Sequence, residues 1–389
     1  MGIIDVNRLG QRGETMYGHD IEKYGNRVKA FGWETILIDG HNLEEINAAF
    51  IQAQSVHDKP VMIVAKTLKG KGISFLEDKD GWHGKSLSKD ELRLALKYIP
   101  EPKMPEIQIE KPKKINVKAG KNGEVKFTSY KFIPKLATRK AYGNILASLA
   151  KSDKRVLALD AEVSNSTKSE SIKTVDKHQF VEAYIAEQNM AGIAAGLAAE
   201  GKIPFMATYS VFCPGRNWDQ VRVSICYSKA NVKFCGAHAG ISVGPDGATH
   251  QGLEDIAITR CLPNLTVIAP CDSIEAKKAT KAAGKMKGPV YLRFGREKVP
   301  TITTKKTPFK IGQAQVFKDG KDVCIISCGM LTHTSLIAAE QLEKQGITAR
   351  VINCHTLKPL DIKTITKAAK ECGCIVTCEE HQITGGLAS

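Results

Sequence analysis

Short apolar runs that alternate with helical patterns constrain the fold of this chain more than any other feature of its sequence. Residues 60–65 form a continuous apolar run, which is typical of a strand buried on both faces of a parallel sheet. Strand-like runs at 3–7 and 35–38 come before it, and a helical pattern follows the second of them. A strand, a helix and a strand in this order predict a right-handed crossover unit of an α/β sheet.

The helix of this unit has its own start signal. Asn42 can cap it, and Glu45 stands three residues later, where its side chain can reach back as in a capping box. The spacing of the apolar residues that follow predicts that one face of the helix packs on the sheet. These residues are Leu43, Ile46, Ala49 and Phe50.

The same alternation recurs in two further blocks. The second begins near Thr138, which we expect to cap a helix. Helical patterns separate most of its strand-like runs, so the block predicts a second parallel sheet covered on both faces. These runs lie at 156–159, 180–184, 204–209, 232–235, 265–268 and 290–292. In the third block, strands are expected at 323–326, 349–352 and 375–377, with helices at 332–345 and 361–371.

The chain is therefore predicted to be an α/β protein with three parallel-sheet units, of which the first and the last are incomplete. We place the first unit at 1–100, a linker at 101–127, the second unit at 128–300 and the third at 301–389. The linker lacks clear periodicity and is punctuated by prolines. The third unit stops in a Gly-containing loop with no helix after it.

Composition places the chain among ordinary globular proteins. Of its 389 residues, 42% are hydrophobic and 25% are charged. No apolar run reaches the roughly 18 residues of a membrane span, and the first residues do not resemble a signal peptide. The sequence predicts a cytoplasmic protein without a membrane partner. All 11 cysteines lie at or after Cys213, mostly in apolar patterns, which favours buried reduced thiols over disulfides or a zinc site.

A net charge of +15 raises the question of nucleic-acid binding. Much of the lysine excess lies between Lys97 and Lys140, in a stretch with few aromatic residues and no recognised nucleic-acid module. A solvated basic linker is the better interpretation, and we expect no nucleic-acid partner. Local positive charge can still attract phosphorylated substrates.

Glu187 is the first candidate for chemistry. It follows the strand-like run at 180–184 and precedes an apolar run of small residues at 189–199 that predicts a buried helix. A strand-to-helix turn is where ligands gather in open α/β sheets. Burial in such surroundings raises the pKa of a carboxyl group and suits it to sharing a proton. The alternative is an acid that only interacts with the helix dipole.

A glycine-rich loop at 236–251 offers a second set of groups. His238, Asp246 and His250 bring donors, acceptors and proton carriers, while the glycines let the backbone approach a ligand closely. A flexible surface loop with incidental histidines is the alternative. In the first block, the Asn7 side chain and the Leu9 carbonyl could complete a hard-cation site that also holds phosphate oxygens, although a plain loop asparagine is commoner.

Basic and hydroxyl groups form a third set. Arg139, Ser166 and Arg296 suit a phosphate monoester, because arginine forks and hydroxyls match its oxygens. Each taken alone could be a surface charge or a cap. Tyr209 and Phe212 follow a strand and could stack on a planar ring, with core packing as the alternative.

Taken together, these segments resemble the transketolase family. The matching strings keep the family's order and cover essentially the whole chain. They are Asn7-Arg-Leu-Gly, Asp39-Gly-His-Asn, Lys66-Thr-Leu-Lys-Gly-Lys-Gly-Ile, Trp82-His-Gly-Lys, Thr138-Arg-Lys-Ala-Tyr-Gly, Ala186-Glu-Gln-Asn-Met and Asp246-Gly-Ala-Thr-His-Gln. The resemblance implies a thiamine-diphosphate-binding fold, with the three units as diphosphate-binding, pyrimidine-binding and C-terminal domains.

The resemblance also implies a function and a cofactor. The family moves a two-carbon ketol unit from a ketose phosphate to an aldose phosphate with thiamine diphosphate and Mg²⁺ or another divalent cation. By motif match, Glu187 would hydrogen-bond the pyrimidine nitrogen of the cofactor, and Phe212 and Tyr209 would stack on its ring. His250 would lie near the cofactor and the substrate hydroxyls. His83 and Lys69 would line the diphosphate and the reaction centre.

The remaining roles follow from the same match. Asn7 and the Leu9 carbonyl would coordinate the metal together with the diphosphate. Asp246 would hold a substrate hydroxyl, and Glu162 stands where the family has an aspartate near the cofactor, with the charge kept and the side chain longer. The sugar phosphate would be held by Arg139, Ser166, His238 and Arg296.

The match departs from the family pattern at the beginning of the chain. The Gly-Asp-Gly motif that cradles the diphosphate should precede Asn7 and is absent, as are the family's earlier histidines. We therefore expect a fragment of a transketolase or one part of a split enzyme, acting as a homodimer or with a separate N-terminal half. The alternatives are 1-deoxyxylulose-5-phosphate synthase, which shares the cofactor, and a non-catalytic partner subunit.

Overall fold

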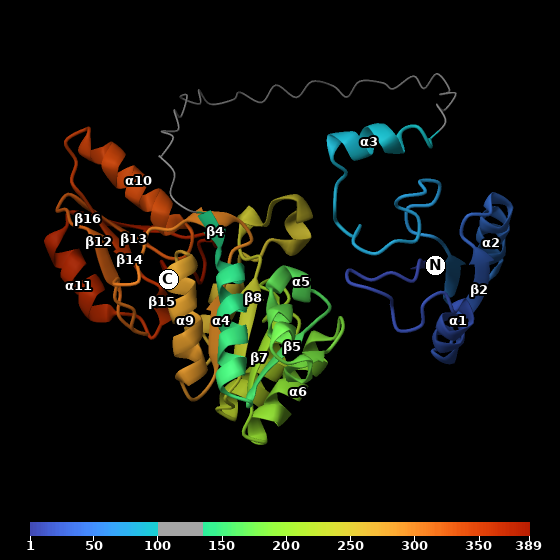
Figure 1. Ribbon diagram of the computed structural model, residues 1–389, viewed down its shortest axis with the longest axis horizontal. Coiled ribbons are helices and arrows are strands. Elements are labelled where there is room, and N and C mark those ends of the chain that lie inside the picture. Colours follow the sequence, from blue (N-terminus) through green and yellow to red (C-terminus); the bar gives the residue numbers. More distant parts are fainter. Residues whose placement is uncertain (100–134) are drawn as a thin grey trace. The chain divides into compact units, whose positions relative to one another are not determined.

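The computed structural model describes residues 1–99 and 135–389. The chain forms two compact units, 1–129 and 130–389, and each is described by itself (Figure 1). The predicted linker at 101–127 lies outside the described residues. The domain boundaries drawn from the sequence stay predictions.

The first unit contains a three-stranded parallel sheet in the order β1-β3-β2. The predicted strand–helix–strand crossover is present in it. Buried Ile36, Ile38 and Ile63 pack with Ala49 and Ala53 of the second helix to form its core. The elements are β1 (Gly2–Val6), α1 (Ile21–Ala30), β2 (Glu34–Asp39), α2 (Leu43–Ser55), β3 (Val61–Lys66) and α3 (Lys89–Ala95).

Two local predictions in this unit need correction, and one helix was not predicted. Leu43 was assigned to the buried face of α2, but it lies in the first turn and is 81% exposed. Asn42 does cap α2, and the Glu45 carboxylate accepts from the Asn42 side-chain amide at 2.9 Å and from the Asp39 N–H at 2.7 Å. The Asn42 backbone N–H donates to the Asp39 carbonyl instead, so the capping box is incomplete. Helix α3 was not predicted, and it begins with a complete capping box formed by Ser88 and Glu91.

The second unit is organised around a seven-stranded sheet in the order β15-β9-β10-β8-β7-β5-β6. All its strands are parallel except β15, which pairs antiparallel with β9 and was not predicted. The strands are β5 (Val156–Asp160), β6 (Phe180–Glu182), β7 (Ile203–Tyr209), β8 (Lys233–Ala237), β9 (Thr266–Ile268), β10 (Val290–Arg293) and β15 (Thr356–Lys358). A short antiparallel pair, β4 (Lys135–Ala137) and β11 (Lys298–Pro300), lies outside this sheet.

Helices cover both faces of this sheet, as predicted. On one face α4 (Thr138–Ser152) and α9 (Ser273–Lys285) bury Phe205 and Leu292, and on the other α6 (Glu187–Ala199) and the π-helix η3 (Val221–Tyr227) bury Met206 and Phe234. Thr138 was expected to cap α4 but is its first residue. Its hydroxyl accepts from the Gly295 N–H and makes no capping bond. Shorter helices connect the strands: α5 (Ser164–Thr167), η1 (Ser169–Thr174), η2 (Lys177–Gln179), α7 (Trp218–Gln220), η4 (Ile241–Asp246), η5 (Ala248–His250) and α8 (Asp255–Arg260).

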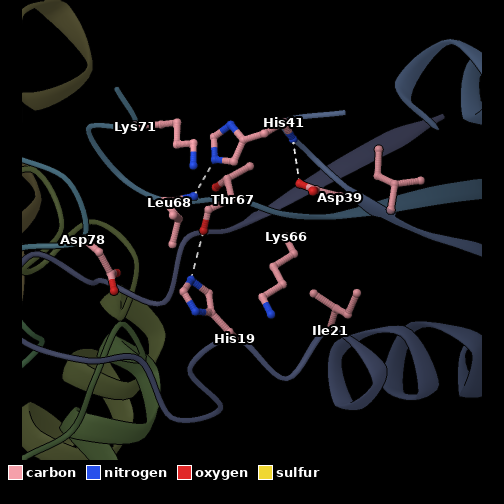
Figure 2. Close-up of a pocket in the computed structure, with 10 residues that line it drawn as sticks. His19, Ile21, Asp39, His41, Lys66, Thr67, Leu68, Lys71 and Asp78 are labelled. Carbon is pink, nitrogen blue, oxygen red and sulfur yellow. Dashed lines mark hydrogen bonds between the residues drawn. The ribbon is translucent and has the colours of Figure 1, made fainter. Parts of the chain in front are cut away.

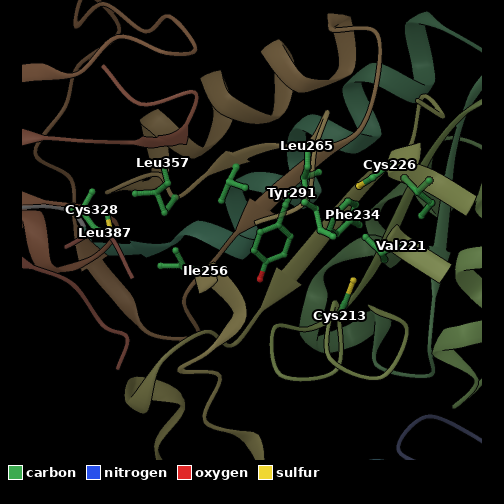
Figure 3. Close-up of a cluster of buried hydrophobic side chains, with 14 of the residues drawn as sticks. Cys213, Val221, Cys226, Phe234, Ile256, Leu265, Tyr291, Cys328, Leu357 and Leu387 are labelled. Atoms are coloured by element: carbon green, nitrogen blue, oxygen red, sulfur yellow. The ribbon is translucent and has the colours of Figure 1, made fainter. Parts of the chain in front are cut away.

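A four-stranded sheet completes the second unit, in the order β12-β14-β13-β16. Strands β13 (Val323–Ser327), β14 (Ala349–Asn353) and β16 (Cys374–Cys378) were predicted, as were α10 (Leu331–Glu343) and α11 (Ile362–Glu371), but the antiparallel β12 (Gln315–Lys318) was not. Ile256 and Tyr291 share one buried cluster with Cys328 and Leu387, shown in Figure 3, and with Ile326 and Ile352 of the four-stranded sheet. The two sheets are therefore joined by a common core.

Two composition-based predictions can be compared with the structure. Eight of the 11 cysteines are buried and none is paired with another, so the prediction that most thiols are buried is confirmed. In residues 1–99 and 135–389, no helix has both the length and the apolar character needed to span a bilayer.

Glu275, buried where α9 meets the four-stranded sheet, generates a prediction about stability and pH. Burial raises its pKa to about 7, although hydrogen bonds from Cys271 and Asn353 lower it. The stability that the protonated group contributes is present below its unfolded pKa of 4.5 and is lost as the pH rises through about 7. Glu275→Gln resembles the protonated acid. It should remove on the order of 3 kcal/mol of that pH-dependent loss.

Denaturant unfolding of the wild type and Glu275→Gln at pH 4.5, 6 and 7.5 measures this effect. Asp160, with a pKa raised to about 7 by burial, acts in the same window. Some pH dependence should therefore remain in Glu275→Gln and fall further when Asp160→Asn is added. If Glu275→Gln kept the full pH dependence of the wild type, our assignment of Glu275 would be wrong.

Candidate active site

Most of the predicted site residues of the second unit follow the carboxyl ends of adjacent parallel strands. Glu162 follows β5, Glu187 follows β6, Phe212 follows β7, His238 follows β8 and Arg296 follows β10. These strands are neighbours in the order β10-β8-β7-β5-β6. Parallel strands end at one edge of the sheet, so the fold gathers these residues there, where α/β sheets bind ligands.

Backbone strain marks the same edge. Glu162, Tyr184 and His238 have φ values of 63°, 56° and 58°, in the left-handed region that non-glycine residues rarely adopt. Each lies one or two residues beyond the end of its strand. In the first unit Arg8, with φ 58°, stands in the same position after β1, between Asn7 and Leu9. Such outliers persist where surrounding contacts impose them, and they cluster at functional sites.

Glu187 is the first residue of α6 and is 5% exposed. Its carboxylate accepts from the Arg216 guanidinium at 3.0 Å, and its carbonyl accepts from the Asn217 side chain at 3.3 Å. The same guanidinium lies 4.1 Å from the centre of the Phe212 ring. Arg216 therefore joins the buried acid to the aromatic cluster, a link that sequence reasoning missed because no local spacing reveals it.

The aromatic cluster consists of Tyr209, Phe212, His238 and His250. The Tyr209 ring stacks on His238 with centroids 4.2 Å apart and on Phe212 at 5.9 Å, and the edge of His250 meets Phe212 at 5.3 Å. Tyr209 and His238 are buried, while His250 is less so. The predicted stacking residues and the two histidines of the glycine-rich loop are thus brought together.

His238 is neutral in this environment. Burial lowers its pKa to about 3, and the positive charges of Arg139 and Arg296 lower it further. Its Nδ1 is buried and has no hydrogen-bond partner among the described residues. An unpaired buried nitrogen is costly, so its persistence beside two arginines is typical of a group that meets a ligand.

The predicted phosphate-binding residues form one connected group. Arg139 donates to the Ser166 carbonyl at 2.5 Å and to the Arg296 carbonyl at 3.2 Å. Arg296 donates to the Val243 carbonyl and lies 3.5 Å from the Asp246 carboxylate. Burial lowers the pKa of Arg139, as does the charge of Arg296. Two acids, Asp246 and Glu297, lie near Arg139, and Lys168 adds a third positive charge near His238. Three cations against two acids leave net positive charge, which favours an anionic ligand.

Asp160 is a buried acid that sequence reasoning overlooked, although it ends an apolar strand. It is fully buried and accepts from the Val163 N–H and from the Thr167 and Ser169 hydroxyls, each at 2.7 Å. These bonds fold the turn that carries Glu162 and Ser166. The Glu162 N–H donates to Glu182 at 2.9 Å, which fixes the backbone but does not test its predicted cofactor role.

The predicted metal residues of the first unit are folded onto their own loop. The Asn7 side-chain oxygen accepts from the Leu9 N–H at 3.1 Å, and its amide donates to Asp5 at 2.9 Å. No group of three or more His, Cys, Asp or Glu side chains in the described parts of the chain could hold a metal ion. Asn7 and Leu9 therefore offer part of a site.

Lys69 and His83 do meet in the first unit. The Lys69 ammonium donates to His83 Nδ1 at 3.2 Å, and burial together with this charge lowers the pKa of His83. Beside the start of their loop lies a cavity of about 610 Å³ lined by His19, His41 and Lys66 (Figure 2). His19 Nε2 donates to the Thr67 carbonyl at 2.9 Å and His41 Nε2 accepts from the Leu68 N–H at 2.7 Å, which shapes the cavity wall.

Known protein families match nearly the whole length of the chain. Family models match the transketolase thiamine diphosphate binding domain at residues 1–128, the transketolase pyrimidine binding domain at 134–301 and the transketolase C-terminal domain at 312–389. A solved structure described as a split gene transketolase, inactive beta4 tetramer, is 42% identical with a TM-score of 0.61, and the match covers 65% of this chain and 83% of that one. The chain belongs to the transketolase family.

Full-length members of the transketolase family extend beyond this match. Human transketolase is 39% identical over 401 residues, and mouse transketolase-like protein 2 is 40% identical over 403 residues. Both alignments cover all of this chain and 63% of the relative, so the chain spans about 63% of the length of these relatives. Campylobacter jejuni transketolase, 24% identical with a TM-score of 0.60, covers 98% of this chain and shares the fold.

The residues at the sheet edge fit the pyrimidine end of thiamine diphosphate, the cofactor that the family binds. That ring is flat and carries both donors and acceptors, matching the aromatic faces and the buried Glu187 carboxylate. Ser210 Oγ and Asn217 Oδ1 are further buried polar atoms without a partner in the described residues. For the diphosphate end, Asn7, Leu9, Lys69 and His83 supply only part of the charge that a metal-bound diphosphate requires.

The electrostatics of His238 can be tested in solution. Because burial and two arginines hold its pKa near 3, its ring resonances should stay constant from pH 5 to 8 in the folded chain. In denaturant they should titrate near 6.5. Two-dimensional NMR, with His238→Gln to assign the signal, gives the measurement. A folded-state midpoint above pH 5.5 would contradict the neutral, desolvated histidine described here.

Proposed function

We propose that this chain is the later part of a transketolase of the pentose phosphate pathway. It would transfer a two-carbon ketol unit from a ketose phosphate to an aldose phosphate. One observation carries the proposal: Glu187, a buried acid at a strand-to-helix turn, shares the Arg216 guanidinium with the ring of Phe212. A carboxylate beside a stacking ring is the arrangement that an aminopyrimidine needs.

Each residue at the sheet edge has a part in this reaction. When bound, thiamine diphosphate supplies the electron sink for cleaving the ketose carbon–carbon bond. Glu187 would hold the proton shared with the pyrimidine nitrogen, and Phe212 and Tyr209 would stack against the ring. His250, at the edge of the Phe212 ring, would move protons at substrate hydroxyls. Glu162 would contribute negative charge near the cofactor.

The arginine cluster would hold the sugar phosphate. Arg139 and Arg296 supply the positive charge, and Ser166 supplies a hydroxyl. His238, kept neutral by its surroundings, would donate or accept one hydrogen bond without adding charge. Asp246, 3.5 Å from Arg296, would accept from a substrate hydroxyl. These contacts recognise the phosphate and leave the chain length of the sugar open.

The diphosphate end calls for a second contributor. Asn7, the Leu9 carbonyl, Lys69 and His83 would bind Mg²⁺ and the diphosphate together with groups from a homodimer partner or from a separate N-terminal half. The likeness to a split gene transketolase supports the latter. That relative is described as inactive in its beta4 form, which favours a second candidate function: a partner subunit that has no turnover by itself.

The role of Glu187 is tested by reconstitution. The chain is mixed with a polypeptide carrying the Gly-Asp-Gly half, thiamine diphosphate and Mg²⁺, and ketol transfer is followed. Glu187→Ala should lower kcat by a factor of about 10² to 10⁴, the range for a lost proton-transfer group. Glu200→Ala changes an exposed acid at the other end of α6 and serves as the matched control.

Full turnover in Glu187→Ala would exclude the proposed mechanism. Consumption of pyruvate with glyceraldehyde phosphate by the same mixture would instead identify 1-deoxyxylulose-5-phosphate synthase. No turnover of either kind, with the complex intact, would leave the non-catalytic partner subunit as the function.

Cofactor binding gives a separate prediction. Because the described residues offer only part of a diphosphate site, the chain alone should bind thiamine diphosphate and Mg²⁺ at least about tenfold more weakly than the complex with the N-terminal half, a difference of about 1.4 kcal/mol. Isothermal titration calorimetry measures both constants. Equal affinities would show that the second contributor is not needed.

A further inference from the structure

The segment at 379–389, which follows β16, is held against the glycine-rich loop and the helix after it. The Gln382 N–H donates to the Leu253 carbonyl at 3.1 Å, and the Ala257 N–H donates to His381 Nε2 at 3.3 Å. Arg260 donates to the carbonyls of Gly385 and Gly386. Leu387, near one end of this segment, is buried in the core shared by the two sheets (Figure 3).

Glu380 makes the most specific of these contacts. Its two carboxylate oxygens accept from the Ser242 N–H at 2.5 Å and from the Ser242 hydroxyl at 3.1 Å. Its carbonyl accepts from the buried Arg293 guanidinium at 2.8 Å. The Glu380 backbone is thus hydrogen-bonded to β10, while its side chain is hydrogen-bonded to the first turn of η4. A carboxylate with two hydrogen bonds to one residue fixes both distance and direction.

The loop is shaped to receive this carboxylate. Gly240 has φ 82°, and a Cβ at this position would collide with the Glu380 carboxyl group. Only glycine adopts such a backbone freely and allows this approach. The Gly240 N–H donates to the Gly252 carbonyl at 2.9 Å, which closes the base of the loop. From this base to η5, the loop is anchored to other elements by Glu380 at Ser242 and by Arg296 at Val243 and Asp246.

The position of η4 matters because it carries part of the candidate sugar-phosphate site. Val243 and Asp246 both contact Arg296, which in turn contacts Arg139 through its carbonyl. A shift of η4 would therefore move the acid and one arginine together, whereas His238 is fixed at the end of β8. Ser242 is thus a point at which η4, and with it the contacts of the Arg296 side chain, is held in place.

We propose that Glu380 is a positioning residue for the sugar-phosphate site. It fixes η4 and, through Asp246 and Arg296, the spacing of the phosphate-binding groups. The anchoring of η4 by Glu380 follows from the geometry, and its effect on sugar-phosphate binding rests on the proposed function. In this way the four-stranded sheet, which supplies none of the candidate site residues, acts on the chemistry of the neighbouring sheet.

The test compares Glu380→Ala and Glu380→Gln with Glu379→Gln in the full chain. Glu379 is the matched control, because its carboxylate accepts from the Leu387 and Ala388 N–H groups of its own segment. Hydrogen–deuterium exchange reports on peptides covering η4 and, separately, α8. In Glu380→Ala, exchange in η4 should rise about tenfold or more, with α8 and the thermal midpoint close to wild type. Glu380→Gln keeps one acceptor oxygen and should restore most of the protection.

The second measurement is binding of ribose 5-phosphate, by calorimetry, to the same proteins. Dissociation constants should rise about fivefold or more in Glu380→Ala, should largely recover in Glu380→Gln and should not change in Glu379→Gln. Unchanged exchange in η4 would overturn the positioning role. Faster exchange with unchanged affinity would overturn its link to the ligand. If the wild type bound no sugar phosphate either alone or in the complex with the N-terminal half, while η4 still loosened, the proposed function would fail and the loop anchor would stand.

Discussion

The ion pair between Arg293 and Asp255 is the interaction on which the second unit most depends. Both side chains are buried, with two charge-assisted hydrogen bonds of 2.8 and 3.1 Å between them. The Tyr291 hydroxyl donates to the same carboxylate at 2.7 Å. Burial and the Asp255 charge raise the pKa of Tyr291 well above its usual value, so it remains a donor. A buried pair persists only when its remaining donors are satisfied, and here the Gly252 and Glu380 carbonyls accept from Arg293.

This ion pair explains why the glycine-rich loop and the segment at 379–389 occur together. Arg293 ends β10, Asp255 begins α8, and the two carbonyls belong to the loop base and to that segment. Removing either Arg293 or Asp255 would leave a buried charge without its partner, which costs several kcal/mol. The sheet edge, the loop and the four-stranded sheet are therefore held through a single charged centre.

Sequence patterns predicted the parallel strands well because they are short apolar runs, and the central ones, such as β7 and β8, are buried on both faces. Antiparallel β12 and β15 were missed, since they lie at sheet edges and their pairing depends on distant residues. Thr138 shows how tertiary contacts override a local rule: its hydroxyl bonds Gly295 instead of capping its helix. Helix α3 was overlooked although its capping box, Ser88 and Glu91, was present in the sequence.

For the site, residue types and loop positions were predictable, but their connections were not. The motifs indicated Glu187, Phe212 and the two loop histidines, and strand order then brought them to one edge. Arg216, which joins the acid to the aromatic ring, lies 29 residues from Glu187 in sequence, with no periodic signal. Glu380 is 138 residues from Ser242. Such links depend on packing between elements, which a pattern of local spacing does not encode.

The two ends of β8 show that a lowered pKa by itself does not identify a residue that binds a ligand. Lys233 at its start and His238 just after its end are both buried, and burial lowers their pKa values to about 7 and about 3. The Lys233 ammonium donates three hydrogen bonds, to the Asn231 side chain and to the carbonyls of Met286 and Gly288. The fold therefore satisfies all three of its donors.

His238 shares burial and a lowered pKa with Lys233, but its contacts and its backbone differ. Its Nδ1 lacks a partner in the described structure, its backbone is strained, and two arginines and a stacked tyrosine face it. A group whose hydrogen-bonding capacity is met by the fold stabilises the fold, whereas one held open in a strained turn keeps that capacity for a ligand. By this criterion the carboxyl end of β8 is part of the candidate active site, and the amino end is part of the scaffold.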